Sequence, residues 1–539
     1  MRRFLSLILA AVMVLSLSAC SERGADKSIS YALDKSPSTL DPQYTGEAEA
    51  QIVISNTFEG LVRISAEGEI IPGIAETWSV SDDGLTYSFN LKQGTEWYCP
   101  ISLKNEFGDE FYEKYSTEKV TARDFVFAMQ RAINPATNSA FAHRLFVIQN
   151  ATEIHSGKLP VDQLGVTAPD DNTLIIQLSE VCPDFIERLT ESVFMPCNEE
   201  FFNSMNGRYG ITQRHILCNG PFYVSSWNSD SAITIRRNNY YFGQQKVIPS
   251  LVNFTFDPDE TSVAKKISNG TVSAALLPPD CPAPENSVTV KETANDTFGF
   301  VFNCSDDVLS NADIRLALCN TIDRSLFEEN ESMVSQSGFV PLSCEAGSLN
   351  YREAIGEQTP SVSFNEAKAV EHWENGLAAL DKQKVSLTVI CTEELESPIR
   401  RQLQIWQKSL GIDLGITVEV KTQSEIEKAV SSGNYQIALT GISTSYESAA
   451  DFFSSLKDKN IFRFRSDEYN AIISRILETD SEQELLGGCF TAENFILQQG
   501  ICYPLYSRSS RFVTAEDVDG IAIFDSENTI SFIGARRYD

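Results

Sequence analysis

The feature that most constrains this chain is a single apolar run at its N-terminus. Met1-Arg2-Arg3 supplies positive charge, and the stretch 4–17 (FLSLILAAVMVLSL) is uncharged and mostly apolar. This run is too short and too weakly flanked for a stable transmembrane helix, and it is typical of a secretory signal peptide. No later segment is long and apolar enough to span a bilayer as a helix. We therefore expect the rest of the chain to fold as a water-soluble body outside the cytoplasm.

Size and charge narrow the classes of function. The chain has 539 residues, of which 42% are hydrophobic and 22% charged, the profile of a folded protein too long for one compact core. Its 43 lysines and arginines stand against 74 aspartates and glutamates, which gives a formal net charge of −31. An acidic surface repels phosphate backbones, so nucleic acid is not an expected partner.

The apolar run ends in a motif with its own chemistry. Leu17-Ser18-Ala19-Cys20 resembles the lipobox of bacterial lipoproteins, in which the cysteine is acylated and becomes the new N-terminus. The resemblance implies a signal peptide at 1–19, lipidation at Cys20 and a polar tether at 20–27. We therefore expect the protein to be held on the extracytoplasmic face of a bacterial cell membrane by its lipid alone.

Motifs for catalysis or metal binding are missing from the sequence. The other 11 of the 12 cysteines are irregularly spaced without a C-x-x-C pair, and the 4 histidines lie far apart. The sequence leaves disulfide bonding open, but Cys304, Cys319 and Cys391 lie within or beside apolar runs and are expected to be buried hydrophobic residues. No G-x-S-x-G, P-loop or H-E-x-x-H motif occurs, and His215 near Cys218 lacks a third orienting group. We expect no enzyme activity, cofactor or metal site.

The hydrophobic pattern predicts mixed helices and strands. Thr121 and Asp124 form a capping-box pattern at the start of one helix. A proline cluster at 278–284 marks an expected domain crossing, and the helix and strand alternation after it indicates a separate α/β lobe. The expected strands are 29–33, 85–91, 174–178, 222–227, 231–236, 298–302, 385–391 and 416–420, and the expected helices are 48–61, 121–133, 183–190, 313–322, 363–380 and 397–410.

Several sequence blocks carry a family resemblance over essentially the whole mature chain. They are STLDP at 38–42, FEGL at 58–61, PGIAETW at 72–78, DGLTYSF at 83–89, VTARDFVFAMQR at 120–131, NGPF at 219–222 and PLY at 504–506. Together they resemble the signature blocks of extracytoplasmic solute-binding proteins, family 5, of peptide-importing ABC transporters. The resemblance implies an α/β, two-lobed periplasmic-binding-protein fold of class II type, with an additional subdomain inserted in the first lobe and a cleft between the lobes that closes like a hinge.

The resemblance also implies a division of the chain and a function. Lobe I is expected at 28–58, 185–275 and 507–539, the inserted subdomain at 59–184 and lobe II at 276–506. A monomer would capture a peptide or peptide-like solute in the cleft and deliver it to an ABC permease. The alternatives are a sensory or regulatory peptide-binding lipoprotein and a binder of a non-peptide solute such as a chelated metal.

One stretch has no counterpart in the family pattern. Residues 98–119 intervene where relatives have a short turn, and they mix aromatic and charged residues. We expect a surface excursion on the inserted subdomain, because loops tolerate insertions, with a ligand lid as the alternative.

The resemblance implies a set of ligand contacts with one departure. The implied residues are Gly46, Glu47, Ala48, Phe141, Gln423, Gly441, Ile442, Ser443, Thr444, Ser445, Tyr446, Glu447 and Tyr506. Peptide-binding relatives have a block resembling G-W-x-A-D-Y whose aspartate pairs with the peptide amine. Here the block reads G-I-S-T-S-Y, and Ser445 stands at the aspartate position. A serine hydroxyl accepts a hydrogen bond from an ammonium but supplies no countercharge.

Three explanations of this departure stay open. Glu47 or Glu447 supplies the missing charge, unless both are solvated surface groups. Alternatively, the ligand is a blocked or cyclic peptide or another small solute. Finally, the alignment of the loop is shifted by a few residues.

Overall fold

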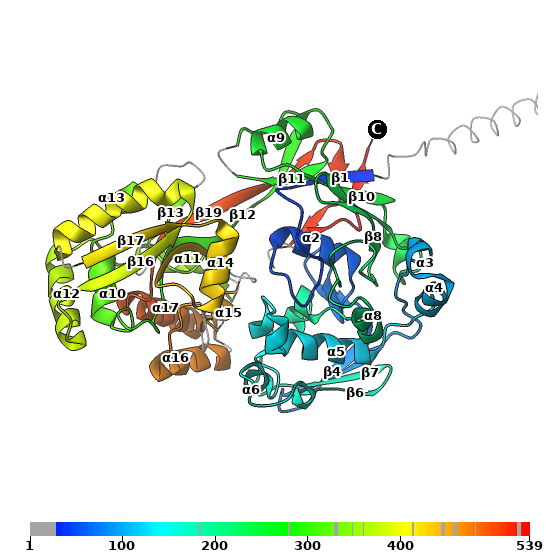
Figure 1. The fold of residues 1–539 in the computed structure, drawn as a ribbon, viewed down its shortest axis with the longest axis horizontal. Coiled ribbons are helices and arrows are strands. Elements are labelled where there is room, and N and C mark those ends of the chain that lie inside the picture. The colour runs from blue at the N-terminus through cyan, green and yellow to red at the C-terminus, as the bar shows by residue number, and fades with distance from the viewer. Residues whose placement is uncertain are drawn as a thin grey trace, which may run out of the picture.

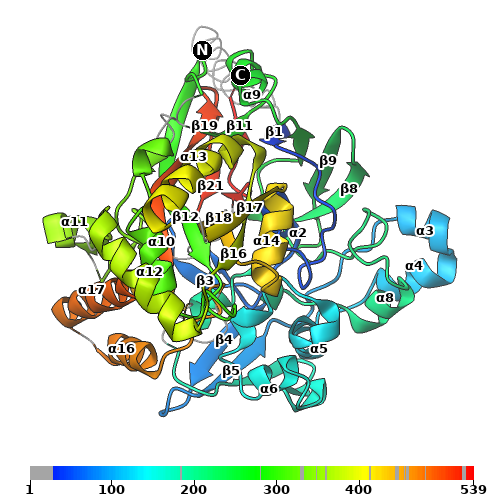
Figure 2. The same cartoon turned by 60° about the vertical axis from the view of Figure 1, so that its left-hand side comes forward.

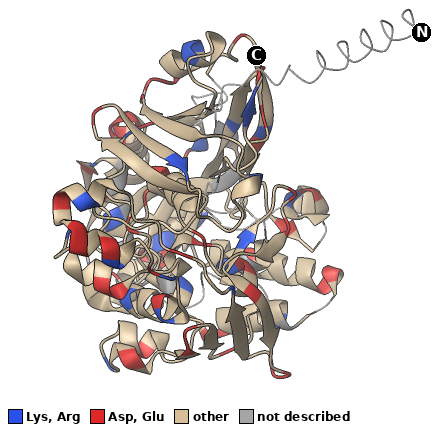
Figure 3. Ribbon diagram, turned by 90° about the vertical axis from the view of Figure 1, so that its right-hand side faces the viewer, with Lys and Arg blue, Asp and Glu red and all other residues tan. Residues whose placement is uncertain are grey.

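The computed structural model describes residues 28–539 except 183–184, 279–280, 328–332, 348, 359–360, 412–413, 444–447, 455, 457–460, 480, 525–529 and 539. Helices and strands alternate along the whole chain (Figure 1), so the predicted α/β class is confirmed. No helix in these residues is long and apolar enough to cross a membrane. Aspartate and glutamate residues, red in Figure 3, occur on many helices and loops of the ribbon in that view.

One large sheet runs through both halves of the molecule. Its strands follow the order β17 (Leu414–Val420), β16 (Val385–Cys391), β18 (Ile437–Ser443), β12 (Ser287–Phe302), β19 (Cys502–Ala515), β11 (Ala274–Leu277), β1 (Ser28–Leu33), β10 (Leu251–Phe256), β9 (Ala232–Arg237) and β8 (Phe222–Asn228), and β13 (Met333–Ser335) also pairs with β19. The long strands β12 and β19 pair antiparallel and join the two halves (Figure 1).

Other helices and strands lie outside this sheet. In the first half they are β2 (Val62–Ile64), β3 (Ile70–Pro72), the sheet β4 (Ala75–Val80), β5 (Thr86–Leu91), β7 (Thr173–Gln177) and β6 (Val166–Asp170), and the helices α2 (Ala48–Thr57), α3 (Ser102–Phe107), α4 (Asp109–Tyr115), α5 (Ala122–Ile133), α6 (Ala151–His155), α7 (Phe185–Arg188), α8 (Glu199–Ser204) and α9 (Glu260–Ser268). In the second half they are α10 (Ala312–Cys319), α11 (Tyr351–Ile355), α12 (Glu366–Leu380), α13 (Glu393–Leu410), α14 (Gln423–Ser432), α15 (Ala449–Ser454), α16 (Asp467–Glu478) and α17 (Glu482–Gln498), with the short pair β14 (Glu345–Ala346) and β15 (Leu349–Asn350).

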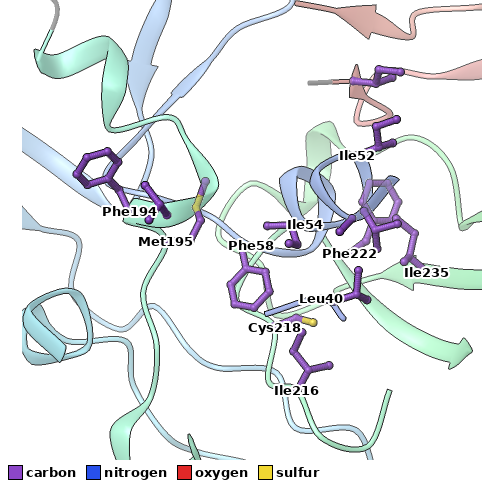
Figure 4. Packing of buried hydrophobic residues seen from close by; sticks show 14 of the residues in the cluster. Leu40, Ile52, Ile54, Phe58, Phe194, Met195, Ile216, Cys218, Phe222 and Ile235 are labelled. Atoms are coloured by element: carbon purple, nitrogen blue, oxygen red, sulfur yellow. The ribbon is translucent and has the colours of Figure 1, made fainter. Parts of the chain in front are cut away.

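The buried hydrophobic side chains separate the molecule into two lobes. One continuous cluster draws its members from residues 29–281 and 512–535, which we call lobe I. Two further clusters draw theirs from residues 298–506, which we call lobe II. In the lobe I cluster, Phe58 at the end of α2 lies beside Ile54 and Cys218 (Figure 4). The predicted inserted subdomain at 59–184 stays a prediction, because its buried residues belong to the same cluster as the rest of lobe I.

The structure corrects several expected boundaries. Helix α2 ends at Thr57 and not at 61, because Phe58 is extended and buried in the core. The strand expected at 298–302 is only the last part of β12, whose first part is a polar sequence that hydrophobic periodicity does not reveal. Cys319 and Cys391 are buried as expected, whereas Cys304 is partly exposed.

The excursion at 98–119 forms the helices α3 and α4. Tyr115 packs edge-on against Phe201, with ring centroids 5.3 Å apart, which ties α4 to lobe I. Both helices lie on the side of lobe I away from lobe II (Figure 1), a position that favours a surface excursion over a ligand lid.

Helix α5 anchors the segment that precedes α2. The guanidinium of Arg131 donates from Nη1 to Asp41 Oδ2 at 2.8 Å and from Nη2 to Asp41 Oδ1, and its Nη2 also donates to Gln43 Oε1 at 2.6 Å. Asp41 and Arg131 are only 7% and 8% exposed. The Arg131 guanidinium also lies 4.4 Å from the ring centre of Phe202. This buried pair fixes the chain between β1 and α2.

The start of α5 has the predicted capping box. Asp124 Oδ2 accepts a hydrogen bond from the backbone N–H of Thr121 at 2.8 Å and one from Trp97 Nε1 at 3.4 Å. Burial raises the pKa of Asp124 to about 7, and these hydrogen bonds lower it by less than burial raises it.

We predict that Arg131→Ala strongly destabilises the fold. It leaves the Asp41 carboxylate buried without a countercharge, which costs about 3–5 kcal/mol in comparable cases. Arg123→Ala, on the first turn of the same helix, is the control, because the Arg123 side chain is 75% exposed and its pair with Asp171 at 3.4 Å is a surface pair worth about 0–1 kcal/mol. Urea unfolding measures both losses, and equal losses would contradict the anchoring role.

We predict that Asp124 makes stability depend on pH. Its pKa in the folded chain lies above the ordinary value of 3.8, so its stabilising contribution is complete below that value and is lost as the pH rises towards about 7. Asp124→Asn resembles the protonated form and does not titrate. Wild type should therefore lose stability relative to Asp124→Asn by about 1.4 kcal/mol per pH unit across this window. Chemical unfolding at several pH values tests this, and a constant difference between the two proteins would refute it.

Candidate functional site

The lobe I part of the predicted site is a rigid turn before α2. The backbone N–H groups of Tyr44 and Thr45 both donate to the Asp41 carbonyl at 3.1 Å, and Gln43 Nε2 donates to the Met195 carbonyl at 2.8 Å. Gly210 packs directly against this turn with φ +77°, and a Cβ there would lie 2.6 Å from the Asp41 nitrogen. The turn therefore holds its shape independently of any ligand.

Two predicted ligand residues from distant parts of lobe I meet at this turn. A Cβ on Gly46 would lie 2.8 Å from Ala140 Cβ and 3.8 Å from the Phe141 ring. The Ala140 N–H donates to the Tyr44 carbonyl at 3.3 Å, which secures the contact. Gly46 and Ala48 are exposed and Phe141 is partly exposed, so all three have surface that faces solvent.

The Glu47 carboxylate is hydrogen-bonded by a neighbouring residue and has no cationic partner among the described residues. Its carboxylate accepts hydrogen bonds from the Ser38 N–H at 2.9 Å and from the Ser38 hydroxyl. Within the described part of the chain it forms no ion pair, whereas Glu49 lies 4.0 Å from Lys35 Nζ. Glu47 is partly buried and occupies the N-cap position of α2 without a side-chain cap bond. The partnership with Ser38 has no signal in the sequence, because it depends on how the turn folds.

The lobe II part of the site lies at the end of β18. The register pairs Gly441 with Phe298, Ile442 with Thr297 and Ser443 with Asp296. Gly441 is partly exposed, whereas Ile442 is 5% exposed and belongs to a lobe II core cluster. Ile442 therefore contributes to packing rather than to a ligand surface. Thr444, Ser445, Tyr446 and Glu447 lie outside the described residues.

The other two predicted site residues of lobe II, Gln423 and Tyr506, lie in different settings. Gln423 begins α14 directly after Thr422, whose side chain forms a capping box with Glu425. Tyr506 is fully buried in the lobe II core and stacks on Phe298 with ring centroids 5.0 Å apart. In this structure Tyr506 has no surface for a ligand, since its place on β19 between two paired strands turns its ring into the core.

The two parts of the site belong to facing sides of the lobes. Helix α14 lies on the side of lobe II that faces α2 in both ribbon views (Figure 1 and Figure 2). The turn at 44–48 directly precedes α2, and Gln423 begins α14. The structure thus brings Gly46 and Phe141 together in lobe I and places Gln423 on the opposing lobe. The register places Asp296 of β12 opposite Ser443 of β18.

Comparison with known proteins identifies the family. The model of bacterial extracellular solute-binding proteins, family 5 Middle, matches residues 69–463. The oligopeptide-binding protein OppA of Bacillus subtilis is 25% identical over 96% of this chain and 97% of its own length. The probable deoxycholate-binding periplasmic protein YgiS of Escherichia coli is 26% identical over 88% of this chain and 87% of its own.

Solved structures share the fold. Listeria monocytogenes OppA bound to peptide superposes with a TM-score of 0.76 at 20% identity, covering 96% of this chain and all of that one. The predicted two-lobed periplasmic-binding-protein fold is confirmed. The chain belongs to the bacterial extracellular solute-binding proteins of family 5, which are binding proteins of ABC importers and not a class of enzymes.

Proposed function

We propose that the mature chain is lipidated at Cys20 and captures a peptide or peptide-like solute between its lobes, on the extracytoplasmic face of the membrane, for delivery to an ABC permease. The similarity to OppA over nearly the full length supports a peptide as the solute. The apolar run that ends at Cys20 supports the lipid anchor. Two separate hydrophobic cores joined by β12 and β19 suit a hinge closure, because each lobe can move without repacking. We expect the protein to act as a monomer.

The observation that carries the peptide proposal is the environment of Glu47. A peptide amine enclosed between two lobes loses hydration and needs a countercharge. The Glu47 carboxylate is positioned by Ser38, has no cation of its own among the described residues, and follows Gly46 at the contact with Phe141. Each carboxylate oxygen accepts more than one hydrogen bond, so the bonds from Ser38 leave capacity for an ammonium. Glu47 would thus replace the aspartate that the family pattern leads us to expect at Ser445.

A second candidate is a non-peptide solute. The relative YgiS is named for deoxycholate, which shows that proteins this similar are assigned different ligands. Ser445 in place of an acid also favours a ligand without a free amine. A sensory role would use the same site with a peptide signal and differs only in whether a permease follows.

We predict that Glu47→Gln selectively weakens the binding of free-amine peptides. Glutamine keeps one oxygen acceptor for Ser38 but removes the charge, so a free-amine peptide should lose about tenfold or more in affinity. The N-acetylated form of the same peptide should bind both proteins about equally. Isothermal titration calorimetry with a peptide found in a pool screen measures this.

Glu49→Gln is the matched control. Glu49 lies two residues further along, in the first turn of α2, and already has Lys35 as a cation partner. Glu49→Gln should leave the binding affinity of both peptides unchanged. Equal weakening of the two peptides by Glu47→Gln would contradict the pairing. Binding of neither peptide by wild type would favour the non-peptide candidate.

A further inference from the structure

Lobe I has a pocket that the proposed peptide site does not use. Its volume is about 700 Å³, which lies within the range of about 300–1,000 Å³ for small-molecule sites. It is lined by Glu76 of β4, the end of β5 with the following loop 92–95, the turn between β6 and β7, and Tyr240 and Phe242 after β9. None of the residues predicted to contact the peptide takes part in it.

Two aromatic side chains at the pocket are held in contact with solvent. Tyr240 is 71% exposed and Phe242 is 38% exposed. Tyr241 between them is buried and donates its hydroxyl to Glu59 Oε2 at 2.8 Å. The Tyr240 N–H donates to Asn238 Oδ1 at 2.9 Å. Because Tyr241 between them is anchored in the core, Tyr240 stays largely exposed and Phe242 stays partly exposed, with the Phe242 ring packed on Tyr241 at 4.5 Å between ring centroids.

Two further aromatic rings, those of Tyr98 and Tyr223, lie next to Tyr240, and we call Tyr240, Phe242, Tyr98 and Tyr223 together the aromatic platform. The Tyr98 ring lies 6.1 Å from Tyr240 and stacks on Tyr223 with centroids 4.0 Å apart. Tyr98 is the first residue of the excursion 98–119, which the family pattern does not contain. The excursion therefore contributes to this aromatic platform, a role that the peptide site does not explain.

The polar walls of the pocket are mostly uncharged. The lining residues include Asn90, Gln93 and Asn172, which have side-chain amides, and Glu76, which has a carboxylate. Asn90 Nδ2 already donates to Thr77 Oγ1 at 3.2 Å, and its carbonyl oxygen remains as an acceptor. Lys92 also lines the pocket, but its ammonium donates to the Gly73 carbonyl and lies 4.5 Å from the centre of the Phe242 ring. Amides both donate and accept hydrogen bonds, as the hydroxyl groups of a ligand require. The Lys92 ammonium is already hydrogen-bonded and lies in a pocket with a carboxylate, so this pocket is a poor site for an anion.

An aromatic platform beside amide groups matches the two surfaces of a sugar ring. The C–H face of a sugar is apolar and packs on an aromatic face, whereas its hydroxyl groups need paired donors and acceptors. We propose that this pocket binds one ring of an uncharged oligosaccharide, with its C–H face on Tyr240 and its hydroxyl groups on Asn90 and Asn172. The protein would then contact a carbohydrate through residues of lobe I that are distinct from the predicted peptide contacts.

Saturation-transfer difference NMR on the mature protein tests this with maltotriose, cellotriose and chitotriose as probes. At least one should receive saturation, and Tyr240→Ala and Phe242→Ala should each weaken that binding by about tenfold. Phe364→Ala is the matched control, because Phe364 is an aromatic residue of lobe II that is 53% exposed, and it should leave binding unchanged. Glu47→Gln should also leave it unchanged, which separates this site from the peptide proposal.

Three results would overturn the carbohydrate proposal. No saturation transfer to any of the three sugars overturns the proposal. So does binding that survives both Tyr240→Ala and Phe242→Ala, or that Phe364→Ala weakens to the same degree. Thermal melts of each variant establish that it is folded, which the exposure of Tyr240 leads us to expect. Capture of a protein partner through Tyr240, with no response to sugars, would show that the platform serves a different class of ligand.

Discussion

The buried ion pair between Asp41 and Arg131 is the constraint on which the lobe I side of the site depends. A buried pair of this kind adds little net stability, because desolvation offsets much of the attraction, but losing one partner is costly. The pair joins the chain before α2 to α5, with Gln43 bound to the same guanidinium. The turn that follows brings Gly46 against Phe141 and leaves Glu47 as the first acidic group after it. The buried ion pair thus positions Gly46 and Glu47, which are in contact with solvent.

The connection between the lobes has a different physical basis. Strands β12 and β19 pass from one hydrophobic core to the other, and irregularities in their pairing occur near Thr293 and Asp296 and between Phe298 and Gly299. Such bulges bend and twist a strand pair locally. A bend in two strands changes the angle between lobes without disturbing either core, since the buried clusters do not extend across the connection. This separation fits a protein that encloses its solute by moving whole lobes.

The sequence predicts a structural element correctly where the interactions that form it lie close together along the chain. The Thr121 and Asp124 capping box and the strand Val385–Cys391 both follow from short-range patterns, and both are confirmed. The family and its fold followed from several motifs taken together. Sequence patterns say less where distant segments determine the packing: the family pattern places Ile442 and Tyr506 at the site, and strand pairing buries both side chains in the lobe II core. The bond from Ser38 to Glu47 and the aromatic platform at Tyr240 depend on packing that no local pattern encodes.

We propose above all that the protein encloses a peptide or peptide-like solute between its lobes. Native mass spectrometry of the chain from Ser21, produced in its own host without the lipid anchor and purified gently, tests this most directly. We expect a population with an extra mass that fragments into amino-acid residues. We also expect added peptide pools to raise the apparent free energy of unfolding, by about 2.7 kcal/mol at a hundredfold excess over the dissociation constant. A protein that carries no peptide mass and gains no stability from any peptide pool would contradict it.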